Sequence, residues 1–164
     1  MMQTKRLVLT KISEKDADKY YIMSCDENVM RFITGKALNR QESDEMLLKI
    51  VEKSNLHPLF GTYMVEDKES GELIGGARFT YEEKDQIEIG FRLLEKHWGK
   101  GYAGEIALKL IEFGKEIEPD FDIIAYVESR NAGSIRVLEK SGLKKIETLP
   151  EGNRIRYKYS LYKA

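Results

Sequence analysis

The stretch His97-Trp98-Gly99-Lys100-Gly101-Tyr102-Ala103-Gly104-Glu105 places a glycine-rich turn directly before an amphipathic helix. Glycines at 99 and 101 allow backbone angles and close approaches that side chains block, so successive N–H groups can point at an anion. The helix that follows adds its unpaired first amides and the positive end of its dipole. A glycine-rich turn by itself is also typical of an ordinary loop, so the neighbouring elements decide between the two interpretations.

A strand precedes this turn and a helix follows it. Residues 86–93, Gln-Ile-Glu-Ile-Gly-Phe-Arg-Leu, alternate between apolar and polar and predict a strand with one polar face. Residues 122–128 are nearly all apolar, as is typical of a strand covered on both faces. A short helix then begins with Asn131 as its cap and stops at Gly142. The helix after the turn has apolar residues at helical spacing: Ala103, Ile106, Ala107, Leu110 and Phe113.

The remaining chain predicts more strands and two more helices. The expected strands are 7–12, 60–66, 73–81 and 154–162, and the expected helices are 14–25 and 41–53. The pair Gly75-Gly76 inside one of these strands predicts a bulge. Together the patterns predict an α/β fold of the α+β type, with a mixed sheet of about seven strands and about four helices.

Length and composition predict one compact domain over residues 1–164. The chain is 41% hydrophobic and 34% charged, which indicates a globular protein with a solvated surface. The net charge of −1 gives no broad basic surface, so we do not expect nucleic-acid binding. One cysteine excludes an intrachain disulfide, and no signal-peptide or membrane-spanning run is present. We therefore expect a cytoplasmic protein, either a monomer or a homodimer, that does not bind membranes.

With these residues in place, the chain resembles the GNAT superfamily of acyl-CoA N-acetyltransferases over nearly its whole length. The segments 98–103, Glu105, Asn131, Ser134 and 137–140 look most like the branch that acetylates N-terminal amines of ribosomal proteins, as does Lys5-Arg6-Leu7-Val8-Leu9. The general pattern of the superfamily has Gln or Arg at the position of Trp98 and glycine at that of Ala103. Both replacements are common in this branch. The resemblance implies a mostly antiparallel sheet whose fourth strand, 86–93, splays from the fifth, 122–128.

The resemblance also implies a site for acetyl-CoA as cosubstrate, without a metal. The amides from Gly99 to Ala103 would hold the diphosphate, and the freed backbone at 91–93 would pair with the pantetheine and contact the thioester oxygen. Asn131 and Ser134 would contact the coenzyme from the opposite side. The implied cofactor-binding residues are Phe91, Arg92, Leu93, Trp98, Gly99, Lys100, Gly101, Tyr102, Ala103, Asn131 and Ser134. For Trp98 a role as anchor of the turn, and for Lys100 plain solvent exposure, remain open.

Glu88 is our candidate for the general base, directly or through water, because it lies on the polar face of the strand 86–93. The alternative is a glutamate that is simply solvated. A weak base suffices for an N-terminal amine, whose pKa is roughly 7.7–8.0 against roughly 10.4 for lysine. Many superfamily members protonate the leaving thiolate with a tyrosine seven residues after the Asn position, which here is Leu138. Ser134 or a water would then replace that acid.

The resemblance implies that the acceptor is a primary amine that attacks directly in a ternary complex, and the subgroup resemblance favours a protein N-terminal amine. Polyamines, amino acids and aminoglycosides stay open as acceptors, since related folds accept them all. Two other classes also stay open: a coenzyme-binding sensor without transferase activity, and an RNA-associated module on ribosomes. The two histidines, His57 and His97, lack clustered carboxylates or thiols and predict no metal site.

Overall fold

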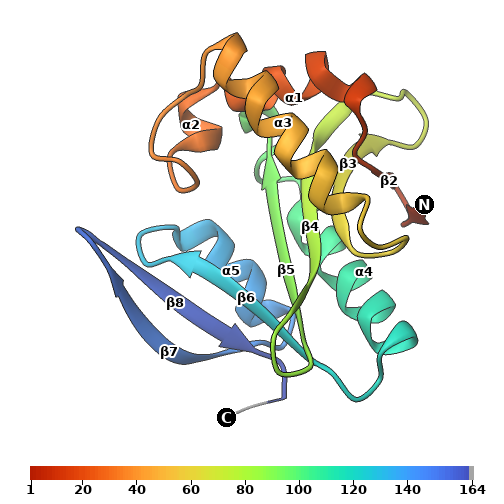
Figure 1. Cartoon of the computed structure of the whole chain (residues 1–164). Coiled ribbons are helices and arrows are strands. Elements are labelled where there is room, and N and C mark those ends of the chain that lie inside the picture. Colours follow the sequence, from red (N-terminus) through yellow and green to blue (C-terminus); the bar gives the residue numbers. More distant parts are fainter. Residues whose placement is uncertain (163–164) are drawn as a thin grey trace. The chain divides into compact units, whose positions relative to one another are not determined.

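The computed structural model describes residues 1–162, which form eight strands, five α-helices and two 3-10 helices (Figure 1). The strands are β1 (Met2–Gln3), β2 (Leu7–Lys11), β3 (Gly61–Asp67), β4 (Leu73–Glu82), β5 (Gln86–Leu93), β6 (Asp122–Glu128), β7 (Lys144–Glu151) and β8 (Arg154–Ser160). The helices are η1 (Glu14–Asp16), α1 (Ala17–Ser24), α2 (Glu27–Met30), α3 (Arg40–Ser54), η2 (Glu95–His97), α4 (Tyr102–Ile117) and α5 (Ala132–Lys140). None of the helices in this part of the chain is long and apolar enough to cross a membrane.

The strands form one mixed sheet in the order β1-β2-β3-β4-β5-β6-β8-β7. The pair β5–β6 is parallel, whereas β1–β2, β2–β3, β6–β8 and β7–β8 are antiparallel. The parallel ladder joins residues 86–88 to residues 122–124, although β5 continues to Leu93 and β6 to Glu128. The two strands therefore stop pairing halfway along. This confirms the splay between the strands 86–93 and 122–128 that the family resemblance implied.

Two strands and one α-helix lie outside the ranges that the sequence predicted: β1, β7 and α2. Strand β7 was missed because its side chains are mostly exposed and show no apolar alternation. Strand β1 has two residues, and its pairing with Leu9 and Val8 of β2 defines it. Helix α2 has four residues, and the Asp26 side chain caps it by accepting from the N–H groups of Asn28 and Val29. Neither β1 nor α2 is long enough to show a periodic pattern.

The chain divides into two compact units, and the sheet strands β4 and β5 contribute to both. Unit 1 contains Met1–Arg78 and Arg92–Lys100. Unit 2 contains Phe79–Phe91 and the described residues from Gly101 onward.

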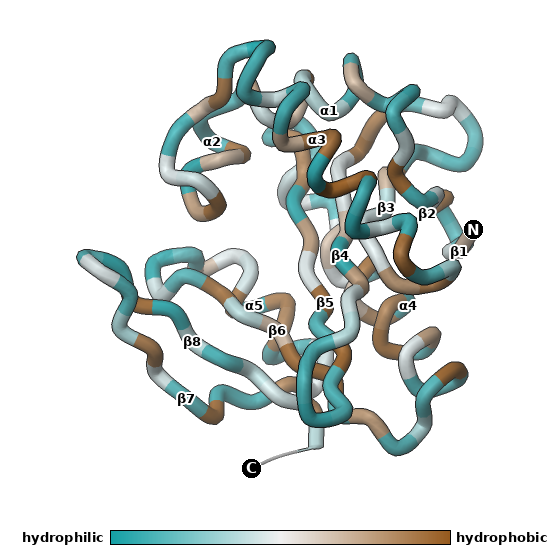
Figure 2. The backbone as a smooth tube through the Cα atoms, viewed as in Figure 1, coloured by the Kyte–Doolittle hydropathy of each residue, from teal (hydrophilic) through white to brown (hydrophobic). Residues whose placement is uncertain are grey.

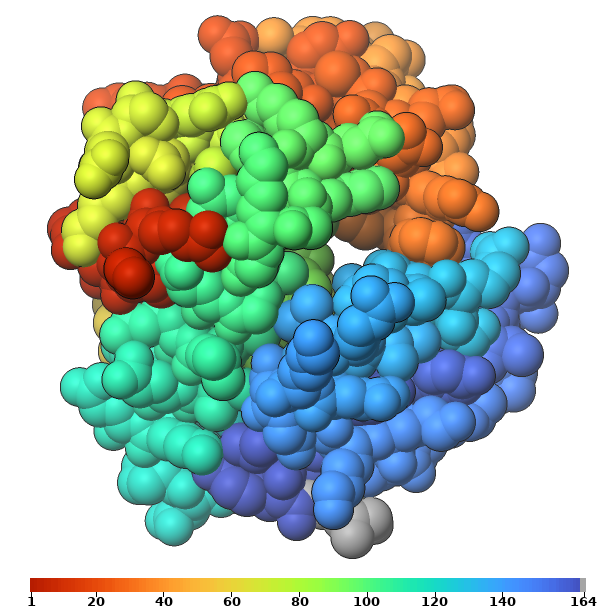
Figure 3. All heavy atoms as spheres, turned by 180° about the vertical axis from the view of Figure 1, so that it is seen from behind, coloured from red at the N-terminus to blue at the C-terminus, as the bar shows by residue number. Residues whose placement is uncertain are grey.

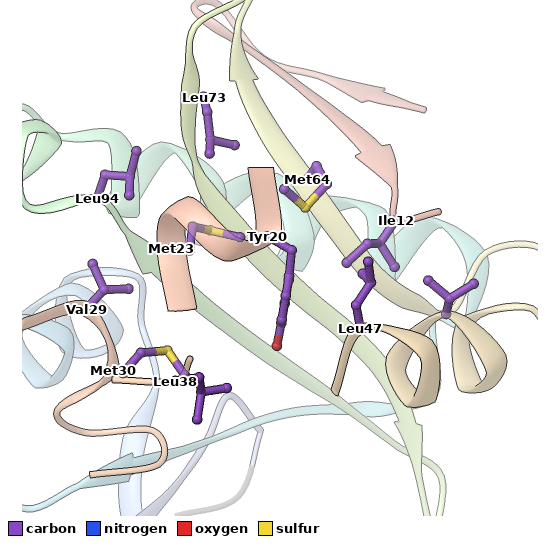
Figure 4. Close-up of a cluster of buried hydrophobic side chains, with 11 residues drawn as sticks. Ile12, Tyr20, Met23, Val29, Met30, Leu38, Leu47, Met64, Leu73 and Leu94 are labelled. Atoms are coloured by element: carbon purple, nitrogen blue, oxygen red, sulfur yellow. The ribbon is translucent and has the colours of Figure 1, made fainter. Parts of the chain in front are cut away.

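Unit 1 has a core between its helices and strands β3 and β4 (Figure 4). Helix α3 packs against α1 and β3, and a capping box starts it: Asn39 Oδ1 accepts from Glu42 N at 2.8 Å, and Glu42 Oε1 accepts from Asn39 N at 3.0 Å. The core side chains are Ile12, Tyr20, Met23, Val29, Met30, Leu38, Leu47, Val51, Met64, Leu73 and Leu94.

The N-terminal residues of unit 1 lie against the turn between β3 and β4 (Figure 3, dark red beside yellow). Lys68 N donates to Arg6 O at 2.8 Å, and Lys68 Nζ donates to Thr4 O at 3.2 Å. The turn itself is held by Asp67, whose Oδ1 accepts from Glu69 N and Ser70 N. These contacts fix the start of the chain on unit 1.

In unit 2, helix α4 packs closely on the sheet. Hydrophobic and hydrophilic residues interchange along this helix in Figure 2, and its buried residues are Ile106, Ala107, Leu110, Ile111 and Gly114. A Cβ at Gly114 would lie 2.7 Å from Ile123 Cδ1 of β6, so glycine allows the short distance between helix and sheet. Phe113 of α4 also packs on Phe79, with ring centroids 5.2 Å apart.

Helix α5 of unit 2 ends in a Schellman motif, as the stop at Gly142 predicted. Gly142 has a φ of +98°, its N–H donates to Glu139 O at 3.1 Å, and Leu143 N donates to Leu138 O at 3.1 Å. Leu143 is buried directly after this turn. The chain then reverses into β7.

Candidate functional site

The glycine turn, residues 98–103, has the backbone that the sequence predicted. Gly99 and Gly101 have φ angles of +73° and +81°, the left-handed region in which a side chain is strained. Gly101 is the N-cap of α4 and provides no side chain, and the ladder of the helix starts with Glu105 N donating to Gly101 O at 3.1 Å. The amides of Ala103 and Gly104 thus lie outside the helical ladder. A Cβ at Gly104 would meet no atom within 4 Å, so the space beside the first turn is open.

Two hydrogen bonds within unit 1 hold the start of this turn. Trp98 Nε1 donates to Leu93 O at 3.0 Å, and Arg6 Nη1 donates to Lys100 O at 3.0 Å. The Trp98 side chain is nevertheless 49% exposed. Its ring therefore anchors the turn to the end of β5 while one part of it stays available to a ligand.

The end of β5 is held by an unusually close approach to β4 in unit 1. A Cβ at Gly75 would lie 2.1 Å from Arg92 O and 2.9 Å from Leu93 Cα, and Leu94 N donates to Ile74 O at 3.0 Å. Only glycine leaves room for the Arg92 carbonyl at this position. The sequence predicted a bulge at Gly75-Gly76 and did not reveal this close contact with the Arg92 backbone. A glycine inside a strand was the signal that could have indicated it.

Glu88 lies in unit 2, in the last residue pair of the parallel ladder, opposite Ile124. The sequence predicted one polar face on this strand and left open that Glu88 is simply solvated, but Glu88 is 8% exposed and Gln86 is 5% exposed. Gln86 Oε1 accepts from Lys158 Nζ at 3.4 Å, which shows that residues of β8 reach over this face. The candidate base is therefore a buried glutamate at the point where β5 and β6 part.

The N-terminus of α5, also in unit 2, places Asn131 and Ser134 on one turn. Asn131 Oδ1 accepts from Ser134 N at 3.2 Å, so the predicted cap is confirmed. The Ser134 side chain is half-buried. Leu138, at the position where many superfamily members have tyrosine, is 2% exposed and packs in the core. Leu138 therefore provides no acidic group at this position. Ser134 is the residue of α5 that has a hydroxyl group.

Glu128 supports the turn that leads to Asn131, and sequence reasoning missed it. Its carboxylate accepts from Arg130 Nε at 2.7 Å and from Arg130 N at 2.9 Å, and Asn131 N donates to Glu128 O at 2.9 Å. Burial alone would raise the pKa of Glu128, but the hydrogen bonds from Arg130 and its charge lower that pKa below its ordinary value. The signal that could have indicated this role is a glutamate at the end of a buried strand, two residues before an arginine.

The predicted site residues thus fall into two groups, one in each unit. Arg92, Leu93, Trp98, Gly99 and Lys100 belong to unit 1, where they form one connected segment. The unit 2 group consists of Glu88, Phe91, Gly101, Tyr102, Ala103, Asn131 and Ser134. In unit 2, helices α4 and α5 pack against each other. An open depression of about 490 Å³ in unit 1 is lined by Asp26, Leu94, Glu95 and Lys96, none of which is a predicted site residue.

The residues present fit a CoA diphosphate. Two left-handed glycines, an N-terminus of a 16-residue helix without a side-chain cap, and open space at Gly104 provide N–H donors and room for an anion. Among residues 1–162, no group of three or more His, Cys, Asp or Glu side chains could hold a metal ion.

Comparison with known proteins gives the family. A family model described as an acetyltransferase (GNAT) domain matches residues 6–144. The uncharacterized N-acetyltransferase p20 of Bacillus licheniformis is 29% identical over 146 residues, which cover 88% of this chain and 82% of that protein.

Two solved structures share the fold at lower identity. One is RimL, a ribosomal L7/L12 alpha-N-protein acetyltransferase in complex with CoA, with a TM-score of 0.81, 12% identity, and coverage of 96% of this chain and 94% of that chain. The other is the spermidine N-acetyltransferase of Vibrio cholerae in complex with CoA and spermine, with a TM-score of 0.77, 17% identity and coverage of 94% of each chain. The chain thus belongs to the GNAT family of acetyl-CoA-dependent N-acetyltransferases.

Proposed function

We propose that this protein transfers the acetyl group of acetyl-CoA to a protein N-terminal amine by direct attack in a ternary complex. The observation that carries the proposal is the glycine turn, whose left-handed residues Gly99 and Gly101 lead into the uncapped first turn of α4. The acceptor class is supported by the sequence resemblance to the ribosomal-protein branch. The structural similarity to RimL supports it further, although spermidine N-acetyltransferase has the same fold.

In this proposal the chain binds the coenzyme mainly through its backbone. The amides from Gly99 to Ala103 hold the diphosphate, with Lys100 adding positive charge and Trp98 packing beside the coenzyme. The backbone at Phe91 to Leu93 pairs with the pantetheine, because the β5–β6 ladder ends at Glu88 and Ile124. Asn131 and Ser134 contact the coenzyme at the start of α5.

Acetyl-CoA supplies a thioester: the amine nitrogen forms a bond to the acetyl carbon, the carbon–sulfur bond breaks, and the sulfur takes up a proton to leave as the CoA thiol. The backbone amides of Arg92 and Leu93 stabilise the charge on the thioester oxygen. Glu88, directly or through water, accepts the proton that the amine loses. Ser134 or a water donates the proton to sulfur, and a thiol with a pKa of roughly 8.5 needs little help to leave.

Free-thiol release from acetyl-CoA is the test of this function. The acceptor panel contains peptides that start with Ser, Ala or Thr, and polyamines and aminoglycosides as small amines. Turnover on peptides supports the proposal, whereas turnover on small amines alone contradicts the proposed acceptor class. Coenzyme binding without turnover on any acceptor would identify a sensor.

The chain offers a matched control for the glycine turn. Gly99 and Gly71 have φ angles of +73° and +74°, and a Cβ at either position would meet no atom within 4 Å. The substitutions Gly99→Glu and Gly71→Glu therefore impose the same backbone strain and add the same charge. We expect Gly99→Glu alone to raise the KM for acetyl-CoA at least tenfold, because only its carboxylate lies in the diphosphate site. Equal KM values in the two variants would place the coenzyme elsewhere.

Two further variants test the catalytic groups. Glu88→Gln should lower kcat most strongly at low pH, where the amine is protonated and the base matters most. A pH–rate profile that this variant leaves unchanged would remove Glu88 as the base. Ser134→Ala should lower kcat modestly and weaken coenzyme binding, and unchanged values of both would remove Ser134 from the site.

A further inference from the structure

The side chain of Arg92 lies in an apolar part of unit 1 with few acceptors. Its Nη1 donates to the Sδ of Met30 at 3.0 Å, and its Cζ lies 5.1 Å from the ring centroid of Tyr20. Met30 is 0% exposed, Tyr20 is 1% exposed, and Arg92 itself is half-buried. A thioether is a weak hydrogen-bond acceptor, and an aromatic face attracts a cation without accepting hydrogen bonds from the five N–H groups of the guanidinium. Most donors of this guanidinium are thus unused by the protein.

Within the described residues, Arg92 also forms no ion pair with a carboxylate, unlike Arg40, Arg130 and Arg156. Arg40, whose side chain is 46% exposed, pairs with Asp18 and Asp44 at 2.9 Å each. Arg130, which is 67% exposed, pairs with Glu128 at 2.7 Å. The less exposed Arg92 therefore keeps an uncompensated positive charge, and such a charge is stable in a binding site that receives an anion.

The Tyr20 side chain adds a second donor at the same place. Its hydroxyl is buried and has no hydrogen-bond partner among the described residues, although buried polar groups are normally paired. Figure 4 shows the Tyr20 ring pointing away from Leu73 and Leu94, so that the hydroxyl lies toward the end of the cluster that contains Met30 and Leu38. The guanidinium lies over this same ring. The two unused donors thus lie within about one side-chain length of each other.

From these contacts we infer that the Arg92 guanidinium and the Tyr20 hydroxyl bind a carboxylate of the acceptor. Arginine suits this role because its fork of N–H groups matches a carboxylate in two parallel hydrogen bonds. The inference rests on the proposed function, in which the amides of Arg92 and Leu93 face the thioester. One residue then provides both contacts, so the carboxylate lies within one arginine side chain of the reacting carbon.

This geometry restricts the acceptors to amines that also have a carboxylate. The carboxylate has to be a few bonds from the attacking nitrogen, as in a peptide whose first residue is Asp or Glu, or in a free amino acid. Polyamines would instead bring further positive charge toward Arg92, and like charges at short distance repel. The site therefore selects an amine that has a nearby carboxylate.

The test compares acceptor pairs that differ only in the carboxylate. A C-terminally amidated peptide starting with Glu is compared with the same peptide starting with Gln, and a free amino acid is compared with its amide. In the unchanged protein we expect kcat/KM to be at least tenfold higher for the carboxylate member of the preferred pair. The first pair identifies a peptide acceptor and the second a free amino acid.

The variants Tyr20→Phe and Arg92→Lys should each lower this carboxylate-to-amide ratio at least fivefold, chiefly through KM. Tyr20→Phe should not lower the melting temperature, since the hydroxyl that it removes has no hydrogen-bond partner among the described residues. Its control is Tyr21→Phe, because Tyr21 also lies beneath a guanidinium, Arg40, at 5.4 Å, but that arginine has its own carboxylates. The control should leave the ratio unchanged.

The outcomes separate the inference from the proposed function. A ratio near one in the unchanged protein, or a ratio that Tyr20→Phe and Arg92→Lys leave intact, overturns the carboxylate site while acetyl transfer stands. Without turnover on any acceptor, the transferase proposal fails. Calorimetric titration of each pair in the presence of CoA then still tests the inference, because binding of the carboxylate member should weaken in Tyr20→Phe and not in Tyr21→Phe.

Discussion

Replacing Gly75 by alanine should disturb both the stability of the protein and its coenzyme site. The new Cβ would lie 2.1 Å from the Arg92 carbonyl oxygen, about 1.3 Å short of the 3.4 Å at which ordinary contact begins. It would also lie 2.9 Å from Leu93 Cα. Both atoms are backbone atoms and cannot rotate away, so β4 and the end of β5 have to move apart.

The size of the effect follows from the cost of overpacking. Inserting a methyl group into a packed site typically costs about 1–3 kcal/mol. Alanine returns about 0.4–1 kcal/mol by restricting the unfolded chain, so the net loss of unfolding free energy should be about 1.3 kcal/mol. For a protein of this length that lowers the melting temperature by about 3–5 °C. Displacing the Arg92 and Leu93 backbone should also raise the KM for acetyl-CoA.

The next residue is the matched control. A Cβ at Gly76 would have its nearest neighbours, Met23 Cε and Tyr63 O, at 3.6 Å, which is ordinary contact. Gly76→Ala should therefore change the unfolding free energy by no more than about 1 kcal/mol. Thermal denaturation of both variants, with free-thiol release to measure KM, makes the comparison. If the two variants melt at the same temperature, the close approach at Arg92 is wrong.

Three further predictions follow from single contacts. Glu128→Gln should lower the free energy of unfolding by about 1–2 kcal/mol at pH 7. Because the pKa of Glu128 is lowered in the folded protein, the difference in stability between the two proteins should shrink as pH falls below about 4.3. A difference in urea unfolding that does not depend on pH would argue against the Arg130 contact. Asn39→Ala should lower stability by about 1 kcal/mol through loss of the α3 cap, and an unchanged denaturation midpoint would show that the cap contributes nothing. Trp98 is the one tryptophan of the chain and directly precedes Gly99, so CoA should change its fluorescence in the unchanged protein, and an equal response in Gly99→Glu would contradict the diphosphate site.

Local sequence was sufficient to predict the glycine turn and the helices around it. The left-handed angles at Gly99 and Gly101, the cap at Asn131 and the stop at Gly142 all depend on atoms within a few residues along the chain. The nearly continuous apolar run 122–128 likewise predicted a buried strand, and β6 is buried along almost its whole length. Such features are encoded by backbone geometry and periodicity, which do not need a partner from elsewhere in the chain.

Burial of the polar positions on β5 could not be predicted in the same way. Alternation along 86–93 was compatible with a solvated face, and the structure shows Gln86 and Glu88 buried. The reason lies far away in the sequence, because Gln86 meets Lys158 of β8, 72 residues later. Strand β1 shows the same limit, since its two residues become a strand only by pairing with β2.

The sequence alone determined the family, the glycine turn before α4 and the order of most elements, because each depends on the types and spacing of neighbouring residues. Tertiary structure alone decided that the Arg92 carbonyl packs on Gly75 and that the Arg92 side chain meets Tyr20 and Met30. These partners come from segments separated by many residues, and only the folded sheet and helices of unit 1 bring them together. The physical reason is that backbone conformation is a local property, whereas the environment of a side chain is set by long-range packing.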